Sequence, residues 1–498
     1  MRRAAPSSAP RLTHRLAVLA AVALAVPLAP AAAHAQATPA AVDTVTRRID
    51  EALPAGRVIQ RLVSRADTSQ RYALYLPSSY ARDRQWPVLF LLDPRGRALL
   101  PMQRFQGAAE RHGYVVISSY NTLSDGPAEP NYSAMNAMLE DVQRALSVNS
   151  RRLYLVGFSG TARFAWDMSE QLTGSVAGIV GAGAAVPGGR SWIRMHLGSS
   201  SPVLFGAVGT LDPNYEEVRA FDAELESTRT PHHIERFDGG HEWPPLDVAA
   251  RAVAWFDLQA MRRGLAARDQ RWIDSLYADW LASAARVDSA GDAPAAARHY
   301  RALRADFDGL TNVGAVTARL ATLGREPRVQ RTERAENLVA ERDRRLGEAL
   351  VAFADELRRA ESPPSLSEAR RRVELDALRR EAARTDDSIS ATSAKRGLER
   401  VFVHMSFYVP RDLFAARRYA QAALALRLAR LIKAGDAGAC FGLARALAQT
   451  GDTSGALEAL ECAAASNQLG AAAVDRDPLL APLRGEARYQ AVMARLRQ

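Results

Sequence analysis

The most informative segment of the chain reads Leu153-Tyr154-Leu155-Val156-Gly157-Phe158-Ser159-Gly160-Thr161. Its four apolar residues predict a strand, and the two glycines around Ser159 allow a very tight turn. The residues that follow, 162–168, predict the first turns of a helix. A strand–turn–helix of this kind pushes a serine hydroxyl out of the backbone, where it can attack a carbonyl carbon.

Predicted strands and helices alternate on both sides of this segment. The run 87–93 is continuously apolar up to its final aspartate, as expected of a strand buried on both faces of a mainly parallel sheet. The alternation predicts an α/β fold over residues 55–262, a doubly wound sheet with right-handed crossovers. Its strands are expected at 57–63, 71–77, 87–93, 114–118, 153–156, 177–183, 203–209 and 233–237.

A carboxylate and a histidine follow two of the later strands. A serine hydroxyl needs a base within hydrogen-bond reach, and that base needs an orienting carboxylate. Asp212 follows the strand at 203–209, and His241 follows the strand at 233–237 after two glycines. Taken singly, Asp212 could be a helix N-cap and His241 a turn residue. The three strand ends together, in the order Ser159, Asp212, His241, predict a catalytic triad.

With these residues, segment 55–262 resembles the α/β-hydrolase fold. It is most similar to secreted serine esterases related to the polyhydroxybutyrate depolymerase and dienelactone hydrolase groups, and the resemblance covers under half of the chain. It implies that Ser159 is the nucleophile, His241 the general base and Asp212 the acid that holds it. The matching stretches are Gly157-Phe158-Ser159-Gly160, Leu211-Asp212-Pro213-Asn214-Tyr215 and Phe237-Asp238-Gly239-Gly240-His241-Glu242-Trp243-Pro244-Pro245.

Two positions depart from the pattern of these enzymes. Thr161 stands where glycine is usual, and Asp93-Pro94 stands where the strand usually ends in His-Gly. A tetrahedral oxyanion needs two converging backbone N–H donors. Gly160 is expected to supply one; because Pro94 has no N–H, the second is expected from Arg95 rather than Gly96.

Substrate contacts are predicted for Tyr120, Asn121 and Trp243, which follow a strand end or the histidine. For Trp243 the alternative is that it packs beneath the histidine loop. No His, Asp, Glu or Cys cluster has metal-ligand spacing, so neither a metal nor another cofactor is expected.

The first 35 residues have the pattern of a secretory signal peptide, which predicts a periplasmic or secreted protein. A basic start precedes an apolar run at 16–33, and Ala33-His34-Ala35 provides a cleavage site, with a linker expected at 36–54. The alternative is an uncleaved membrane anchor, which Pro27 and Pro30 disfavour; no membrane span is expected after cleavage.

Removing the four arginines of the predicted signal peptide lowers the formal charge from +10 to +6. The mature chain has no basic block with interleaved aromatics, so nucleic acid is not an expected partner.

The second half, residues 265–498, is predicted to be all-helical. Gly435-Asp436 and Gly451-Asp452 each open a helix, and residues 413–466 resemble tetratricopeptide repeats. Such a surface either binds a peptide or protein partner or serves as a platform for the first half. The charge-rich residues 325–400 are expected to form long helices or a partly flexible connection. Cys440 and Cys462 are expected to be small core residues rather than a disulfide.

Three functions follow from these patterns. The first is an exported serine hydrolase that cleaves a small or oligomeric ester through an acyl-enzyme intermediate. The second is a periplasmic interaction protein in which the helical repeats carry the function and the hydrolase unit is weakly active or inactive. The third is a serine peptidase, because its triad is chemically the same.

Overall fold

A computed structural model of the chain describes residues 42–49, 51–186, 201–228, 230–386, 388–466 and 469–497. The predicted signal peptide and the first residues of the predicted linker lie outside these ranges. Among the described residues, no helix is both long and apolar enough to cross a membrane.

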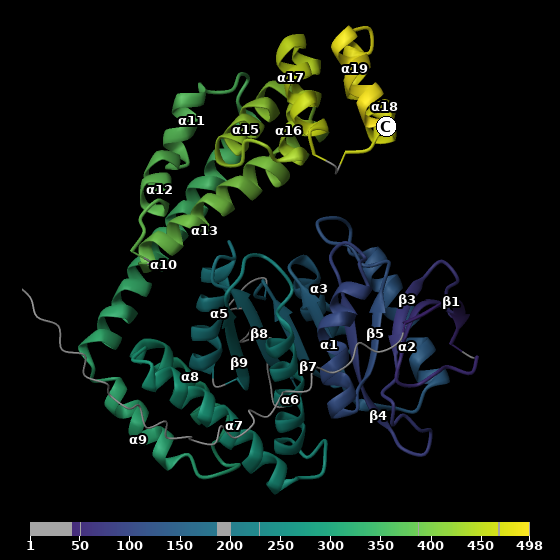
Figure 1. Cartoon of the computed structure of the whole chain (residues 1–498), viewed down its shortest axis with the longest axis vertical. Helices are drawn as coiled ribbons and strands as arrows, with labels where there is room; N and C mark the ends of the chain where they lie inside the picture. Colours follow the sequence, from purple (N-terminus) through teal and green to yellow (C-terminus); the bar gives the residue numbers. More distant parts are fainter. Residues whose placement is uncertain are drawn as a thin grey trace, which may run out of the picture. The chain divides into compact units, whose positions relative to one another are not determined.

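A nine-stranded sheet forms the first half of the described chain (Figure 1). The strand order is β1-β2-β3-β5-β4-β6-β7-β8-β9, and every neighbouring pair is parallel except the two pairs that β3 makes with β2 and β5. This arrangement confirms the predicted doubly wound, mainly parallel sheet. The strands are Val42–Arg48 (β1), Val58–Val63 (β2), Arg71–Tyr75 (β3), Trp86–Leu92 (β4), Val115–Ser119 (β5), Val148–Phe158 (β6), Val176–Ala182 (β7), Val203–Gly209 (β8) and His232–Phe237 (β9).

Helices cover both faces of this sheet and bury its apolar side chains. Helices α1 and α6 pack on one face, while α2, α3 and α5 pack on the other (Figure 1). Every residue of β4, β7 and β8 is buried, as expected for strands covered on both sides. The helices are Leu99–His112 (α1), Glu129–Ala145 (α2), Gly160–Gln171 (α3), Tyr215–Thr228 (α5) and Leu246–Arg262 (α6).

Strand β1 corrects the prediction of a linker at 36–54. It pairs in parallel with β2 at the edge of the sheet. Its sequence, Val-Asp-Thr-Val-Thr-Arg-Arg, is rich in β-branched residues that favour extended backbone. Because backbone hydrogen bonds rather than apolar burial hold an edge strand, the hydrophobic pattern alone did not reveal it.

From α7 onward the described chain is entirely helical, which confirms the predicted all-α second half. The tetratricopeptide assignment stays a prediction. Asp436 and Asp452 cap α16 and α17 by accepting backbone hydrogen bonds from Ala439 and Gly455, as their positions before each helix suggest. The elements are Gln270–Ser289 (α7), Ala293–Phe307 (α8), Gly314–Leu323 (α9), Pro327–Arg359 (α10), Leu366–Arg372 (α11), Leu375–Ala382 (α12), Ile389–Val403 (α13), the π-helix His404–Tyr408 (η1), Val409–Ala415 (α14), Tyr419–Ile432 (α15), Ala437–Thr450 (α16), Thr453–Ala464 (α17), Ala471–Arg476 (α18), the 3₁₀-helix Pro478–Leu483 (η2) and Ala487–Leu496 (α19).

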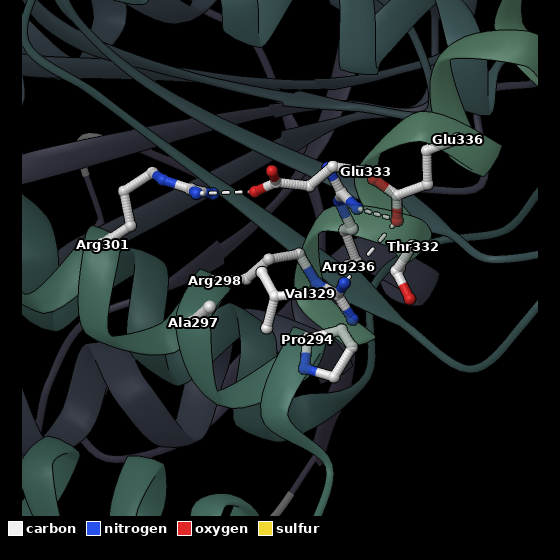
Figure 2. Close-up of a pocket in the computed structure, with 9 residues that line it drawn as sticks. All are labelled: Arg236, Pro294, Ala297, Arg298, Arg301, Val329, Thr332, Glu333 and Glu336. Carbon is white, nitrogen blue, oxygen red and sulfur yellow. Dashed lines mark hydrogen bonds and ion pairs between the residues drawn. The ribbon is translucent and has the colours of Figure 1, made fainter. Parts of the chain in front are cut away.

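The charge-rich residues 325–400 form α10, α11, α12 and most of α13, and ion pairs hold the first turns of the long helix α10 to β9 and α8. Figure 2 shows Arg301 of α8 pointing toward Glu333 of α10, while Arg236 of β9 and Arg298 of α8 both point toward Glu336. The N–O distances are 3.2 Å for the first pair and 3.6 Å for each of the other two. Several linked charges hold a helix better than one exposed pair would.

Cys440 and Cys462 form a disulfide between α16 and α17, so the expectation of unpaired core cysteines was wrong. Their Cα atoms lie 5.9 Å apart, within the range a disulfide spans. The helical pattern placed both residues on packed helices, but it could not show that the two would face each other.

The hydrophobic core on the α1/α6 face continues into the helices that follow. Ile273 of α7, Phe307 of α8 and Val329 of α10 belong to the same cluster as the side chains beneath α6. A second core begins at Leu346, further along α10, and extends to the last helix. Helix α10 therefore contributes to both cores, while the domain boundary at 262–265 stays a prediction.

A buried ion pair joins β9 to α8. His233 lies with Nδ1 2.8 Å from Asp306 and Nε2 3.0 Å from Glu235. Burial alone would lower the pKa of His233, but the two carboxylates outweigh it and raise the pKa to about 9. The nearby His299 has a lowered pKa, chiefly from burial, and Glu235 is ionised, so neither titrates between pH 6.5 and 9.

We expect the free energy of unfolding to fall by about 3 kcal/mol between pH 6.5 and 9. The folded-state pKa of His233 lies above its unfolded value, so this stabilisation is complete below pH ~6.5 and is lost as pH rises through the folded pKa. Urea unfolding at a series of pH values measures it. In His233→Gln, which cannot titrate, the His233 part of this pH dependence should vanish. A part from His232 should remain, because burial lowers the pKa of His232 but its contact with Asp222 outweighs burial and raises it. An unchanged slope in the variant would contradict the assignment.

Candidate active site

Ser159 lies at the turn between β6 and α3 in a strained backbone conformation. Its φ is +54°, in the region that residues other than glycine rarely adopt. The turn is so tight that a Cβ on Gly157 would stand 2.3 Å from the Thr161 carbonyl oxygen. The Ser159 amide donates to the carbonyl of Ala182 at 2.8 Å, which fixes the turn to β7. The side chain is thereby presented at the carboxyl edge of the sheet.

The structure brings Ser159, His241 and Asp212 into one chain of hydrogen bonds. His241 Nε2 lies 2.9 Å from Ser159 Oγ, and His241 Nδ1 lies 2.9 Å from Asp212 Oδ2. Asp212 is buried, and its other carboxylate oxygen accepts from the Asn214 amide at 2.7 Å. This geometry allows the imidazole to take a proton from the serine hydroxyl while the carboxylate orients the ring.

Phe158 and Gly183 lie against the His241 imidazole, and sequence reasoning missed the role of both. The ring of Phe158 packs against the imidazole with centroids 4.6 Å apart. Gly183 has φ +61°, and a Cβ there would stand 3.0 Å from Asp212 Oδ2 and 3.1 Å from His241 Cε1. Only glycine leaves room at this point, and its position directly after β7 was the available signal.

Thr161 fits the turn because its hydroxyl is fully used. The side chain is buried, and its hydroxyl lies within hydrogen-bond distance of the Leu92 and Phe158 carbonyl oxygens, which share its one hydrogen, while it accepts from the Phe158 amide at 3.1 Å. The local adjustment expected for a residue larger than glycine therefore consists of hydrogen bonds that tie the turn to the end of β4.

The expected oxyanion donors are only half supported by the geometry. Gly160 is the first residue of α3, so its N–H has no acceptor within the helix. The Arg95 N–H, in contrast, donates to Asp93 Oδ1 at 2.9 Å, and the Gly96 N–H donates to the Asp93 carbonyl at 3.1 Å. Arg95 is therefore not a free donor as it stands, which corrects the prediction. The Arg95 N–H is occupied because the Asp93 side chain turns back toward the loop that follows it and accepts this hydrogen bond.

Asp93 organises this loop as a buried carboxylate. It is 0% exposed and accepts from the Arg97 guanidinium at 3.0 Å and from Trp243 Nε1 at 2.9 Å, in addition to the backbone amides of Arg95 and Arg97. Burial opposes ionisation of Asp93, but the hydrogen bonds from Arg97 and Trp243 outweigh it and lower the pKa below its usual value.

The three residues predicted to contact substrate make hydrogen bonds within the protein instead. Trp243 is buried, bonds Asp93 and packs on Phe158 with ring centroids 5.5 Å apart, so it packs beneath the histidine loop. Tyr120 donates to the Gln60 carbonyl at 2.7 Å, and Asn121 accepts from the Arg71 amide at 2.8 Å. The structure therefore does not bring these three side chains to the cavity beside Ser159.

A cavity of about 640 Å³ opens beside Ser159 and His241. Its far wall comes from the helical half, which sequence reasoning did not connect to the site. Burial and the nearby Arg400 lower the pKa of His404 in this wall, so its imidazole is neutral at pH 7. The wall includes a π-helical turn, a feature frequent at functional sites. The residues of the wall are Asn337, Ala340, Glu341, Asp343, Arg344, Gly347 and Val351 of α10, Arg400 and Val403 of α13, and His404 and Tyr408 of η1.

No cluster of three or more His, Cys, Asp or Glu side chains suited to a metal occurs within the described ranges.

The strand order, with one antiparallel strand near an edge, and a serine at the strand–helix turn define the α/β-hydrolase fold. No family model and no curated protein matches the sequence.

The solved structures that this chain resembles include hydrolases, esterases and a peptidase. An S-formylglutathione hydrolase from Staphylococcus aureus is 13% identical, with 40% of this chain and 97% of that chain covered and a TM-score of 0.32. A feruloyl esterase module from Clostridium thermocellum is 13% identical, with 41% and 88% covered and a TM-score of 0.33. Dipeptidyl peptidase 4 from Porphyromonas gingivalis is 13% identical, with 40% and 34% covered and a TM-score of 0.29. Similarity this distant assigns no activity to the chain.

We expect Asp93→Asn to lower the free energy of unfolding by about 1.5–3 kcal/mol at neutral pH, because charge-assisted hydrogen bonds are lost. The folded-state pKa of Asp93 lies below its unfolded value, so its stabilisation is present above pH ~4 and is lost as pH falls through the folded pKa. The variant's deficit should therefore shrink in acid. Denaturant unfolding measures both effects, with the exposed Asp386→Asn as control; equal stability of Asp93→Asn and wild type would refute this role.

Proposed function

We propose that the protein is an exported serine hydrolase that cleaves carboxylic esters. The observation that carries the proposal is the pair of 2.9 Å contacts linking Ser159, His241 and Asp212. In the first step Ser159 Oγ attacks the ester carbonyl while His241 Nε2 takes its proton. The imidazolium, oriented by Asp212, then gives that proton to the leaving alcohol, and an acyl-enzyme remains. Water, activated by the same histidine, releases the acid and restores the serine.

The cavity supports a substrate with a sizeable group next to the ester. Its volume of about 640 Å³ lies within the range of ordinary small-molecule sites. The wall mixes apolar side chains such as Val351 and Val403 with a neutral His404 and with Tyr408. The acyl and alcohol parts of a small or oligomeric ester could both be held there.

Export is supported by two independent features. Residues 1–35 have the signal-peptide pattern, and the Cys440–Cys462 disulfide suits an oxidising compartment such as the periplasm or the exterior.

One observation favours the second function, an interaction protein with a weakly active hydrolase unit. Arg95 donates its N–H to Asp93, which leaves Gly160 as the oxyanion donor identified at the site. Losing one such donor costs about 10²–10³-fold in turnover. In that case the helical half would carry the function by binding a peptide or protein partner.

We expect Ser159→Ala to lower the hydrolysis of short-chain aryl esters by at least about 10³-fold without changing thermal stability. The matched control is Ser227→Ala, at the exposed end of α5. Release of the coloured phenol measures turnover. Equal activity in the Ser159→Ala protein would refute the nucleophile. Ser159-dependent cleavage of peptides, but not of esters, would favour the serine peptidase instead.

A further inference from the structure

We propose that Arg396 and Arg400 of α13 are positioning residues that hold the loop carrying Asp212 in place against His241. The inference rests on the proposed triad and adds a role for the helical half: that half completes the geometry of the active site. It assigns to two arginines, more than 180 residues beyond Asp212, a part in the reaction that acts through Asp212; Arg400 also lines the cavity, whereas Arg396 is not among the lining residues.

The two guanidinium groups bond the backbone on either side of Asp212. Arg396 Nη1 donates to the Thr210 carbonyl at 3.1 Å. Arg400 donates to the Pro213 carbonyl twice, from Nε at 3.2 Å and from Nη2 at 2.6 Å. The side chains are four residues apart on α13, which places them on one face of the helix. Together the two arginines hold the backbone just before and just after Asp212.

The opposite side of the same loop is bonded to the segment that leads to His241. The Thr210 amide donates to the Phe237 carbonyl at 2.9 Å, and the Leu211 amide donates to the Gly239 carbonyl at 2.9 Å. The loop is therefore held from both sides, through its amides by the histidine segment and through its carbonyls by α13. The Asn214 side chain adds a third tie by donating to the Gly183 carbonyl at 2.8 Å. Removing the arginines leaves the Thr210 and Pro213 carbonyls without these partners.

The arginines are themselves fixed by buried partners. Arg396 is 5% exposed, lies 3.0 Å from Glu216 Oε1 and stacks over the Tyr215 ring at 4.3 Å. Arg400 Nη1 donates to the backbone carbonyl of Asp343 at 2.8 Å. Asp343 is buried on α10 and accepts from the Ser393 hydroxyl of α13 at 2.8 Å. We call the contacts of Arg396 and Arg400 with the Thr210 and Pro213 carbonyls the clamp. Figure 1 shows α10 and α13 running together, so the clamp is anchored on two packed helices.

A clamp of this kind has a kinetic consequence. The carboxylate must stay within hydrogen-bond distance of His241 Nδ1 to keep the ring in its working orientation. A displacement of about 1 Å caused by a change away from the chemistry can cost 10²-fold in rate. The ground-state binding of a small substrate, which does not contact Asp212, should change little.

The test is Arg400→Ala in the full mature chain, with the exposed Lys395→Ala on the same helix as control. We expect kcat for a short-chain aryl ester to fall about ten- to hundredfold. Because Arg400 also lines the cavity, KM is compared in Arg396→Ala, whose residue is not among the lining residues and which should leave KM nearly unchanged. In an Asp212→Ala background Arg400→Ala should cost little more, because the residue that Arg400 positions is already gone. Arg400→Lys should recover part of the rate, and it replaces the alanine variant if that variant does not fold.

A second readout does not depend on turnover. The low-field proton signal of His241 Nδ1–H in the His–Asp pair should be present in wild type and Lys395→Ala and weakened or lost in Arg400→Ala. Wild-type kcat and an unchanged signal in Arg400→Ala would overturn the inference, as would an equal loss of kcat with and without Asp212. A wild-type protein without Ser159-dependent turnover would refute the proposed function instead, and the proton signal would still test the positioning role.

Discussion

The rest of the site depends on one strained backbone position, the φ of +54° at Ser159. The surrounding structure maintains this conformation: the helix crosses Gly157 at contact distance, the Ser159 amide bonds β7, and the Thr161 hydroxyl bonds the ends of β4 and β6. Strain of this kind persists only where neighbours over-determine it. Its result is a hydroxyl at the carboxyl edge of the sheet, where the Asp212 and His241 loops can reach it.

The two halves of the described chain meet at this edge. Helix α10 belongs to the core beneath the sheet at Val329 and to a second core from Leu346, and it lines the cavity from Asn337 to Val351. Helix α13 bonds the backbone beside Asp212. The helical half thus contributes both a wall and a support to the site.

Much of the fold was predictable from sequence because buried parallel strands are continuous apolar runs and the residues of the triad follow strand ends. What escaped prediction depends on contacts between distant segments. Arg95 precedes a helix as an oxyanion donor should, yet the Asp93 carboxylate takes its amide. For Trp243 the sequence left two roles open, and the contact of its indole N–H with the buried Asp93 supports packing beneath the histidine loop. The disulfide and the helical wall of the cavity likewise arise from tertiary packing that no local pattern encodes.

The central claim is that Ser159 is an activated nucleophile, and active-site labelling with a fluorophosphonate probe tests it most directly. The folded mature protein should take up one probe per chain, and peptide mapping should place it on Ser159. Labelling should disappear in Ser159→Ala, which retains the fold but has no hydroxyl to react. A folded wild-type protein that takes up no probe, or that carries it on another residue, would contradict the account.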